Sequence, residues 1–480
     1  MSAGTPAPSR VTPVIEVRSI DYVPPRERHG KVWHQGPFWF TGNFVLATMV
    51  TGFIGPALGL AVGWSVLAVT LGALFGTLFM CFHANQGPTM GMPQMIQSRA
   101  QWGSRGAIFP FAAVVFVYIG FNVFDVILAT DGLGTVLPAP NAVWYPILIA
   151  VSVLIAVVGY DLMMVVQRWL TYLLIIVFGI LTVRAAVTLN MGATIAHGGG
   201  FTGTAFLTQF AAAAGYQISY AVYVSDYSRY LPENTRASRV IWWTYLGAAG
   251  SAVWLMALGS MLGSALPTPD AVASVRQIGN EMLGGFGTFT VIVSAIALVT
   301  IMAVNAYGAM LTSASAIDAF RPVKPTIRLR VVGIVVISVV VFVVALAIPA
   351  SYLDSFNNFV LLMLYFLVPW TAVNLVDFYF VRHGHYAILE IFSPRGMYGR
   401  WAWRGLVAYF AGLATMVPFI SLTFYAGPGA EALGGADISF AVGLAVAGGL
   451  YYLFSRGLDL RAEQEAVSRS RAALTADAAS

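Results

Sequence analysis

An isolated carboxylate, Asp125, stands within an apolar segment that runs from Ala107 to Ala129 and holds no other charged residue. The residues around it read YIGFNVFDVILA. An ionised side chain at the centre of a membrane-spanning helix costs about 2.5 to 3.5 kcal/mol on insertion scales. Such an acid usually faces a partner or a transport pathway. The sequence therefore makes Asp125 the first functional candidate.

The composition places the chain in a membrane. Of its 480 residues, 58% are hydrophobic and only 9% are charged, whereas about 25% are charged in an ordinary soluble domain. The apolar character extends along the whole length, which indicates a protein with many spans and not a secreted protein with a signal peptide. The single cysteine, Cys81, excludes an intramolecular disulfide and a cysteine-rich metal site.

Twelve apolar runs are long enough to cross about 30 Å of hydrocarbon at about 1.5 Å per residue. We therefore predict an all-α membrane protein with 12 transmembrane helices. The predicted spans are 38–60, 63–83, 107–130, 141–159, 165–187, 203–226, 239–265, 285–318, 330–350, 355–381, 403–426 and 437–455.

The basic residues sort by side of the membrane. If the amino terminus is cytoplasmic, all but two of the 25 Lys and Arg residues lie in cytoplasmic segments, and only Arg184 and Arg276 lie opposite. The positive-inside rule then places both termini in the cytoplasm, and we expect a multi-pass protein of the plasma membrane. This distribution explains the net charge of +5 without a nucleic-acid partner.

Glycine and proline interrupt two spans at corresponding places. The first span has Gly52, Gly55 and Pro56 near its middle, and the sixth has Gly215. In a helix interior Gly costs about 1 kcal/mol and Pro about 3 kcal/mol. Interruptions five helices apart favour an inverted repeat with a binding site at mid-membrane. Close packing between helices is the alternative explanation for the glycines.

The chain then divides into five parts. Residues 37–187 and 203–382 form two five-helix repeats, and residues 403–455 hold two additional transmembrane helices. Residues 1–36 and 456–480 are rich in polar and charged side chains. We predict that both are mobile cytoplasmic tails.

Four stretches of the sequence have patterns that an apolar composition alone would not generate. They are IEVRSIDYVPPRERHGKVWHQGPFWFTGNF, GPTMGMPQMIQSRAQWGSRGA, SDYSRYLP and PWTAVNLVDFYFVRHG. They resemble the nucleobase:cation symporter family, and within it the purine and cytosine permease branch. The loop PQMIQSRAQWGSRGA, between the second and third spans, is the most specific of the four because of its Arg, Trp and Gly spacing.

The resemblance implies the five-plus-five inverted-repeat fold of LeuT-like transporters. It also implies a transporter, not an enzyme, that imports a nucleobase or a related small nitrogen heterocycle of the cytosine, purine, allantoin or hydantoin type by cation symport. The expected partners are this heterocycle and the lipid bilayer. We expect no cofactor besides the coupling ion, and a monomeric functional unit.

Members of the family hold their ligand between the unwound parts of the first and sixth helices and the faces of the third and eighth. By this resemblance the third-helix pattern of an aromatic followed four residues on by a polar group falls on Phe121 and Asp125. These two positions share a helix face, and Asn122 extends the stripe. The substrate-binding residues implied by the resemblance are Phe121, Asn122, Asp125, Gly215, Tyr216, Gln217 and Asn305.

The resemblance places the coupling cation between backbone carbonyls near Ala47 and Val50 and the hydroxyl of Thr300. Val299 stands where a second hydroxyl is expected, and a hard cation needs several oxygen ligands. Asp125 stands where members often carry an amide, and a buried carboxylate can carry a proton. We therefore expect H⁺ coupling, with Na⁺ near these residues as the alternative.

In this interpretation Phe121 and Tyr216 sandwich the faces of a planar heterocycle. Asp125, Gln217 and Asn305 bind the donors and acceptors of its rim. Ordinary helix packing would also explain the two aromatic residues, and an interhelical hydrogen bond would explain Asn305.

Other classes of protein have less support. The chain has no phosphate-binding loop, nucleophile elbow or HExxH motif, and no residues at metal-ligand spacing. A channel predicts repeated polar rings, which these spans lack. A transporter of the same fold for an amino acid or an amine stays open, with Asp125 pairing with the substrate cation.

Overall fold

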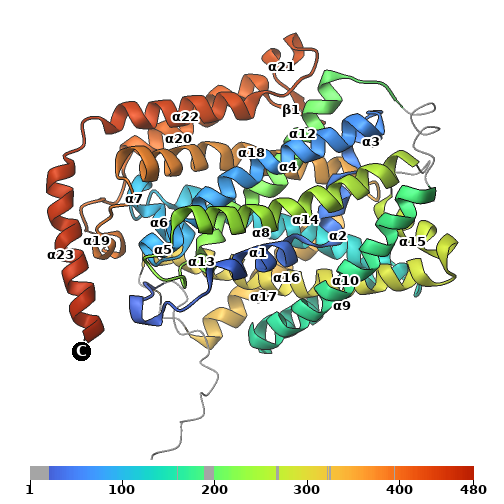
Figure 1. Cartoon of the computed structure of the whole chain (residues 1–480), viewed down its shortest axis with the longest axis horizontal. Coiled ribbons are helices and arrows are strands. Elements are labelled where there is room, and N and C mark those ends of the chain that lie inside the picture. The colour runs from blue at the N-terminus through green and yellow to red at the C-terminus, as the bar shows by residue number, and fades with distance from the viewer. Residues whose placement is uncertain are drawn as a thin grey trace, which may run out of the picture.

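The computed structural model describes residues 21–158, 160–188, 199–265, 270–321, 323, 326–393 and 395–479. Within these residues the protein is built from long helices that run roughly along one direction (Figure 1). The only sheet in these ranges is an antiparallel hairpin of β1 (Ser421–Leu422) and β2 (Tyr425–Ala426). The structure thus confirms the predicted all-α class.

Seven helices in the described ranges are long and apolar enough to cross a membrane, or nine if each of two bent pairs is one span. Each predicted span overlaps a helix, but the eleventh is too long: α20 (Trp403–Met416) ends before Pro418, which lacks an N–H donor. The other long helices are α4 (Val62–Ala84), α8 (Ile108–Gly134), α9 (Asn141–Val158), α10 (Tyr160–Thr188), α14 (Ala237–Ala265), α16 (Phe286–Asp318), α17 (Ile327–Ala347), α18 (Leu353–Val376) and α22 (Ser439–Ser455).

The first span is broken, and its sharpest bend lies before its glycines. Helix α1 (Gln35–Asn43) gives way to α2 (Leu46–Thr51) across Phe44 and Val45, and the two directions differ by 70°. Val45 is extended, with φ −138° and ψ 161°, a conformation that its β-branched side chain favours. The sharp bend therefore lies before Gly52, where our prediction did not place it. The regular helix is interrupted again at Gly52 and Phe53, between α2 and α3 (Ile54–Ala57), so the interruption predicted at Gly52 is present without a sharp bend.

Gly52 also allows close contact between the first span and α14. A Cβ on Gly52 would lie 2.0 Å from the carbonyl oxygen of Met256 in α14. In return, a Cβ on Gly259 of α14 would lie 2.0 Å from the carbonyl oxygen of Met49. Only residues without a side chain fit such an approach, so the packing explanation holds for Gly52.

The sixth span behaves in the same way. Helix α12 (Gly203–Ile218) continues through Gly215, passes into the short 3₁₀ helix η3 (Ser219–Val222), and ends before α13 (Val224–Ser228). A Cβ on Gly215 would lie 2.3 Å from the carbonyl oxygen of Val360 in α18. Gly215 therefore provides close packing on α18, and the irregular backbone comes after it.

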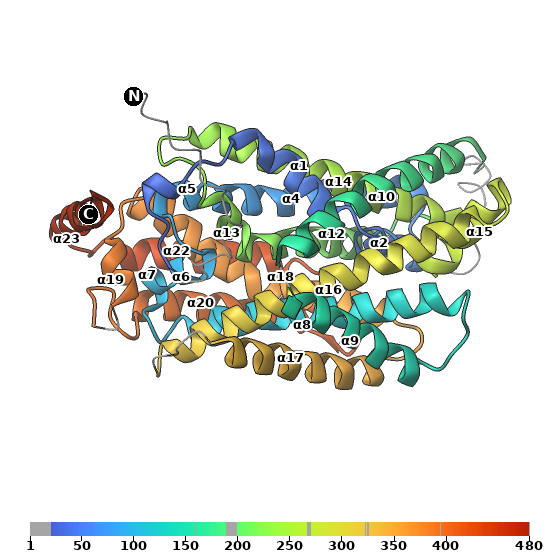
Figure 2. The same ribbon diagram turned by 90° about the horizontal axis from the view of Figure 1, so that it is seen from below.

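The helices form two groups that face each other. Helix α8 packs along α16, while α12 and α14 pack along α4. Figure 2 shows α8, α9 and α17 on one side of the molecule and α1, α4 and α14 on the other. Both broken spans belong to the second group, so their irregular segments can face the first.

The described parts of the two predicted tails are ordered against the bundle. The Val23 N–H donates to the carbonyl of Gly91 at 2.8 Å, and Val23 is fully buried. Helix α23 (Leu460–Ala479) runs across the end of the bundle (Figure 1). Its Glu463 is 4% exposed and pairs with Arg382 at 2.7 Å. These segments differ from the mobile tails that we predicted, and residues 1–20 and 480 lie outside the described ranges.

The buried ion pair gives a stability prediction. Arg382 contacts both Asp377 and Glu463, so Arg382→Leu leaves two buried carboxylates without their cation and should lower the free energy of unfolding by about 3–5 kcal/mol. The matched change Arg471→Leu removes an exposed contact with Glu233 and should cost at most about 1 kcal/mol. Thermal unfolding in detergent compares the two. Equal shifts would contradict a stabilising role for the buried contact between Arg382 and Glu463 of α23.

Candidate ligand-binding site

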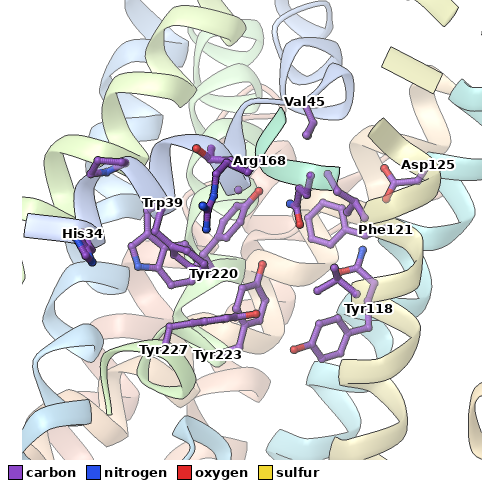
Figure 3. A pocket seen from close by; sticks show the side chains of 18 of the residues that line it. His34, Trp39, Val45, Tyr118, Phe121, Asp125, Arg168, Tyr220, Tyr223 and Tyr227 are labelled. Carbon is purple, nitrogen blue, oxygen red and sulfur yellow. The ribbon is translucent and has the colours of Figure 1, made fainter. Parts of the chain in front are cut away.

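A cavity of about 480 Å³ lies between the two helix groups, with walls from α1, α8, α10, α12, η3 and α16 (Figure 3). At one end its lining includes the exposed side chains of Trp33, Arg168 and Tyr172. At the other it reaches the buried side chains of Phe121 and Asp125. The cavity is therefore open at one end and reaches the middle of the protein.

Asp125 lines this cavity, as the sequence predicted. It is 2% exposed, and its Oδ2 is buried without a hydrogen-bond partner. Among the described residues no ion pair reaches it, and α2, α8, α12, α16 and α18 contain no Lys, Arg or His. A buried carboxyl group in this position is poorly satisfied by the protein. It is available to a proton or a ligand.

The two aromatic residues expected to sandwich a ligand touch each other. The rings of Phe121 and Tyr216 meet edge to face at 5.3 Å between centroids. A flat ring held between two others needs a contact distance of about 3.5–4.0 Å on each face, so the two outer rings must be about 7–8 Å apart. Both residues line the cavity, but a ligand would enter between their faces only after the rings separate.

The two asparagines of the predicted site have different positions. Asn305 on α16 lines the cavity. Asn122 on α8 is not part of the lining, and its Nδ2 donates to the carbonyl of Met302 at 3.1 Å. Asn305 is thus placed to contact a ligand, whereas Asn122 ties α8 to α16.

Gln217 and Gly215 lie behind the cavity wall. The Gln217 side chain is fully buried, and its Nε2 donates to Thr77 Oγ1 on α4 at 2.8 Å. Gly215 faces Val360 of α18. Of the predicted pair in the sixth span, only Tyr216 reaches the cavity. Successive residues of a helix point about 100° apart, so the neighbour of a lining residue faces elsewhere.

The residues expected to hold a cation lie outside the cavity lining. Ala47 and Val50 fall within α2, after the break, and the Val50 carbonyl already accepts from the N–H of Phe53 at 2.9 Å. The Thr300 hydroxyl donates to the carbonyl of Ala297 at 2.7 Å. Within the described ranges no three His, Cys, Asp or Glu residues group as metal ligands. Cation binding at these residues stays a prediction.

The sequence analysis missed several lining residues. Tyr220, Tyr223 and Tyr227 follow Tyr216 at helical spacing and face Trp39 (Figure 3). The recurrence of tyrosine every three or four residues was visible in the sequence, and the structure keeps these side chains on one side of the chain although they lie along α12, η3 and α13. This row carries the aromatic wall from the buried end of the cavity to its open end.

The side chains that line the cavity favour a small planar molecule as its ligand. Aromatic rings offer flat apolar contact, Asn305 both donates and accepts, and Asp125 accepts or, when protonated, also donates. The cavity has the size range typical of small-molecule sites, about 300–1,000 Å³. No described side chain pairs as nucleophile and base in it.

Sequence comparison connects this arrangement with known transporters. Residues 22–443 match the family described as permeases for cytosine/purines, uracil, thiamine and allantoin. A Bacillus subtilis protein that carries the name of a candidate purine-cytosine permease, YxlA, is 40% identical over 92% of this chain and 96% of its own length. The purine-cytosine permease fcyB of Emericella nidulans is 25% identical over 93% and 89%.

Structural comparison identifies the same architecture. A structure described as the inward-facing conformation of Mhp1 matches with a TM-score of 0.73 at 17% identity, covering 95% of this chain and 97% of that one. A closed conformation of Mhp1 with bromovinylhydantoin bound matches with a TM-score of 0.72 at 18% identity, covering 94% and 98%. At such identities the likeness establishes the fold, which is the LeuT-like one that the sequence predicted.

The two asparagines give a paired test. Asn305→Ala removes a cavity group and should weaken cytosine binding up to about tenfold, because one hydrogen bond is worth about 0.5–1.5 kcal/mol. Asn122→Ala removes a helix contact and should lower thermal stability while leaving cytosine affinity within about twofold. Calorimetric titration of the purified variants measures both. Equal losses of affinity would contradict the assignment.

Proposed function

Because the chain belongs to the family of permeases for cytosine/purines, uracil, thiamine and allantoin, we propose that it imports a nucleobase or a related small nitrogen heterocycle by symport with a proton. The protein is a multi-pass integral membrane transporter of Mhp1-like fold, not an enzyme. The carboxyl group of Asp125, which lines the cavity without a protein partner, carries the proposal.

The cavity wall supports a heterocycle as the ligand. Phe121, Tyr216 and the tyrosines that follow it supply flat apolar surface, while Asp125 and Asn305 supply polar groups at the buried end. A relative from Microbacterium maritypicum, 22% identical over 87% of this chain, is named a hydantoin permease. Ligands of this kind share a planar ring with donors and acceptors on its rim.

The surroundings of Asp125 support a proton as the coupling ion. The titratable groups that interact with it are the phenols of Tyr216, Tyr220 and Tyr223, which are neutral at ordinary pH. An ionised carboxylate without a partner is strongly disfavoured in a buried site, and a proton removes that penalty. Na⁺ is the alternative, but Val299 stands where a second hydroxyl ligand is expected.

The chemistry of a carboxyl group links the proton to the ligand. A neutral carboxylic acid donates one hydrogen bond and accepts another, so it pairs with a ring edge that holds an acceptor beside a donor, as cytosine and adenine do. An ionised carboxylate only accepts, and it would face the acceptor of that edge without a hydrogen. Loss of the proton therefore weakens ligand binding at Asp125.

The basic residues predict how the protein is oriented in the membrane. The open end of the cavity is lined by Trp33 and Arg168, and Trp33 follows the basic segment that contains Arg26, Arg28 and Lys31. Basic segments stay in the cytoplasm by the positive-inside rule. We infer that both termini and the open end of the cavity face the cytoplasm of the plasma membrane, so that this conformation is the one that releases ligand inside.

Substitution of the acid tests the coupling. An amide also offers one donor and one acceptor edge, so Asp125→Asn should still bind and exchange cytosine in proteoliposomes but should lose accumulation driven by a pH gradient. The control Asp131→Asn changes an acid of the same helix that does not line the cavity and should transport like the parent. Full uphill uptake by Asp125→Asn, or uptake that requires Na⁺ in the parent, would overturn proton coupling through this residue.

The pH dependence of binding tests the ligand class. A neutral heterocycle that binds protonated Asp125 should lose affinity as the pH rises through the pKa of that group, and Asp125→Asn should remove the dependence. A cationic amine needs the ionised acid and should gain affinity with pH. Thermal shifts with cytosine, adenine, hydantoin, allantoin and amines, with and without Na⁺, distinguish the two. Stabilisation by amines alone would replace the proposal with an amine transporter.

A further inference from the structure

Behind Tyr216, a continuous chain of hydrogen-bonded side chains leads from the cavity wall to the break in the first span. Its members are Tyr216, Thr48, Asn43, Gln217 and Thr77. None is more than 1% exposed. A buried polar network of this kind is favourable only when its members are satisfied, so the individual contacts matter.

The first part of the chain joins the cavity wall to the broken span. The hydroxyl groups of Thr48 and Tyr216 are hydrogen-bonded at 2.9 Å. The Thr48 hydroxyl is also 2.6 Å from the carbonyl oxygen of Asn43, the last residue of α1. Thr48 thus bridges across Phe44 and Val45, where the regular helix is lost.

The second part ties that break to three other helices. Asn43 Nδ2 donates to Gln217 Oε1 and to the carbonyl of Ala248, both at 3.0 Å. Gln217 Nε2 in turn donates to Thr77 Oγ1 at 2.8 Å, and the Thr77 hydroxyl donates to the carbonyl of Ala73 at 2.7 Å. The chain therefore connects the first span with α4, α12 and α14.

The opposite wall of the cavity takes no part in this chain. Asp125 and Asn305 lie on α8 and α16. No hydrogen bond among the described residues joins either of them to a member of the chain. Tyr216 meets that wall through its ring contact with Phe121. The network thus involves one wall only, and it engages the hydroxyl of Tyr216 from behind that wall.

We infer that Thr48, Asn43 and Gln217 are positioning residues of the ligand site. They fix the Tyr216 ring in the cavity wall through its hydroxyl group and keep the broken first span in register with the sixth. The inference rests on the proposed function, because it takes Tyr216 as a ligand contact. Gln217, which the sequence analysis assigned to the ligand, acts from behind the wall.

A double-mutant cycle tests this role. Thr48→Val and Tyr216→Phe should each raise the KM for cytosine uptake by about three- to tenfold, and the double variant should be no worse than Tyr216→Phe alone, because Thr48 acts through that hydroxyl. Thr48→Ser should restore the parent KM. The control Thr182→Val removes a hydroxyl that accepts from Trp254 Nε1 at 2.8 Å, away from this chain, and should leave KM unchanged.

A substitution that only damages the fold would not produce these changes in KM. It lowers the amount of active protein, and so the maximum rate, without changing KM. Effects on KM that multiply in the double variant would overturn the inference.

The same four proteins allow a measurement without ligand. Their thermal unfolding should show coupling between positions 48 and 216, and additive shifts would also overturn the inference. A parent protein that takes up no heterocycle would overturn the proposed function instead, while the unfolding cycle still decides whether the hydrogen-bonded chain exists.

Discussion

Polar groups freed inside an apolar interior must find new partners, and this constraint organises the region around the cavity. A helix broken in hydrocarbon survives only where protein or a cavity satisfies its backbone. After the break in the first span, Gln209 of α12 donates to the carbonyl of Thr51 at 2.9 Å and accepts from the N–H of Gly55. Ser260 of α14 donates to the carbonyl of Gly52 at 3.0 Å. Side chains from the sixth and seventh spans therefore hold the first span in its bent form.

Asp125 differs from these groups because no described residue satisfies it. In a protein where most buried polar atoms are paired, an acid left without a partner and facing a cavity indicates a function that the folded chain alone does not complete. The same acid lies across the cavity from Tyr216, whose hydroxyl is held in the polar chain. One wall thus carries an adaptable group that can take a proton, and the other a fixed one.

The loop PQMIQSRAQWGSRGA is specific for a structural reason. It is buried against the ends of several helices instead of lying in solvent. Ser98 accepts from the indole N–H of Trp370 on α18 at 3.0 Å, and Gln101 donates to Asp377 at 2.6 Å. The backbone N–H of Gln94 donates to Asp226 at 2.8 Å. Few side chains would satisfy so many partners at once, which explains why composition alone would not generate this stretch.

The sequence by itself determined the helical class, the approximate spans and the presence of one isolated acid in the third span. Each depends on a local property, either the apolar length of a segment or the cost of one charge within it. Only the tertiary structure decided where the first and sixth spans break and which amide faces the cavity. Gly215 looked like a break but allows a helix contact, the sharp bend of the first span lies before Gly52, and Asn305 reaches the cavity while Asn122 and Gln217 do not. The reason is that the direction of a side chain depends on how its helix is rotated against its neighbours, and that rotation follows from packing between residues far apart in the sequence.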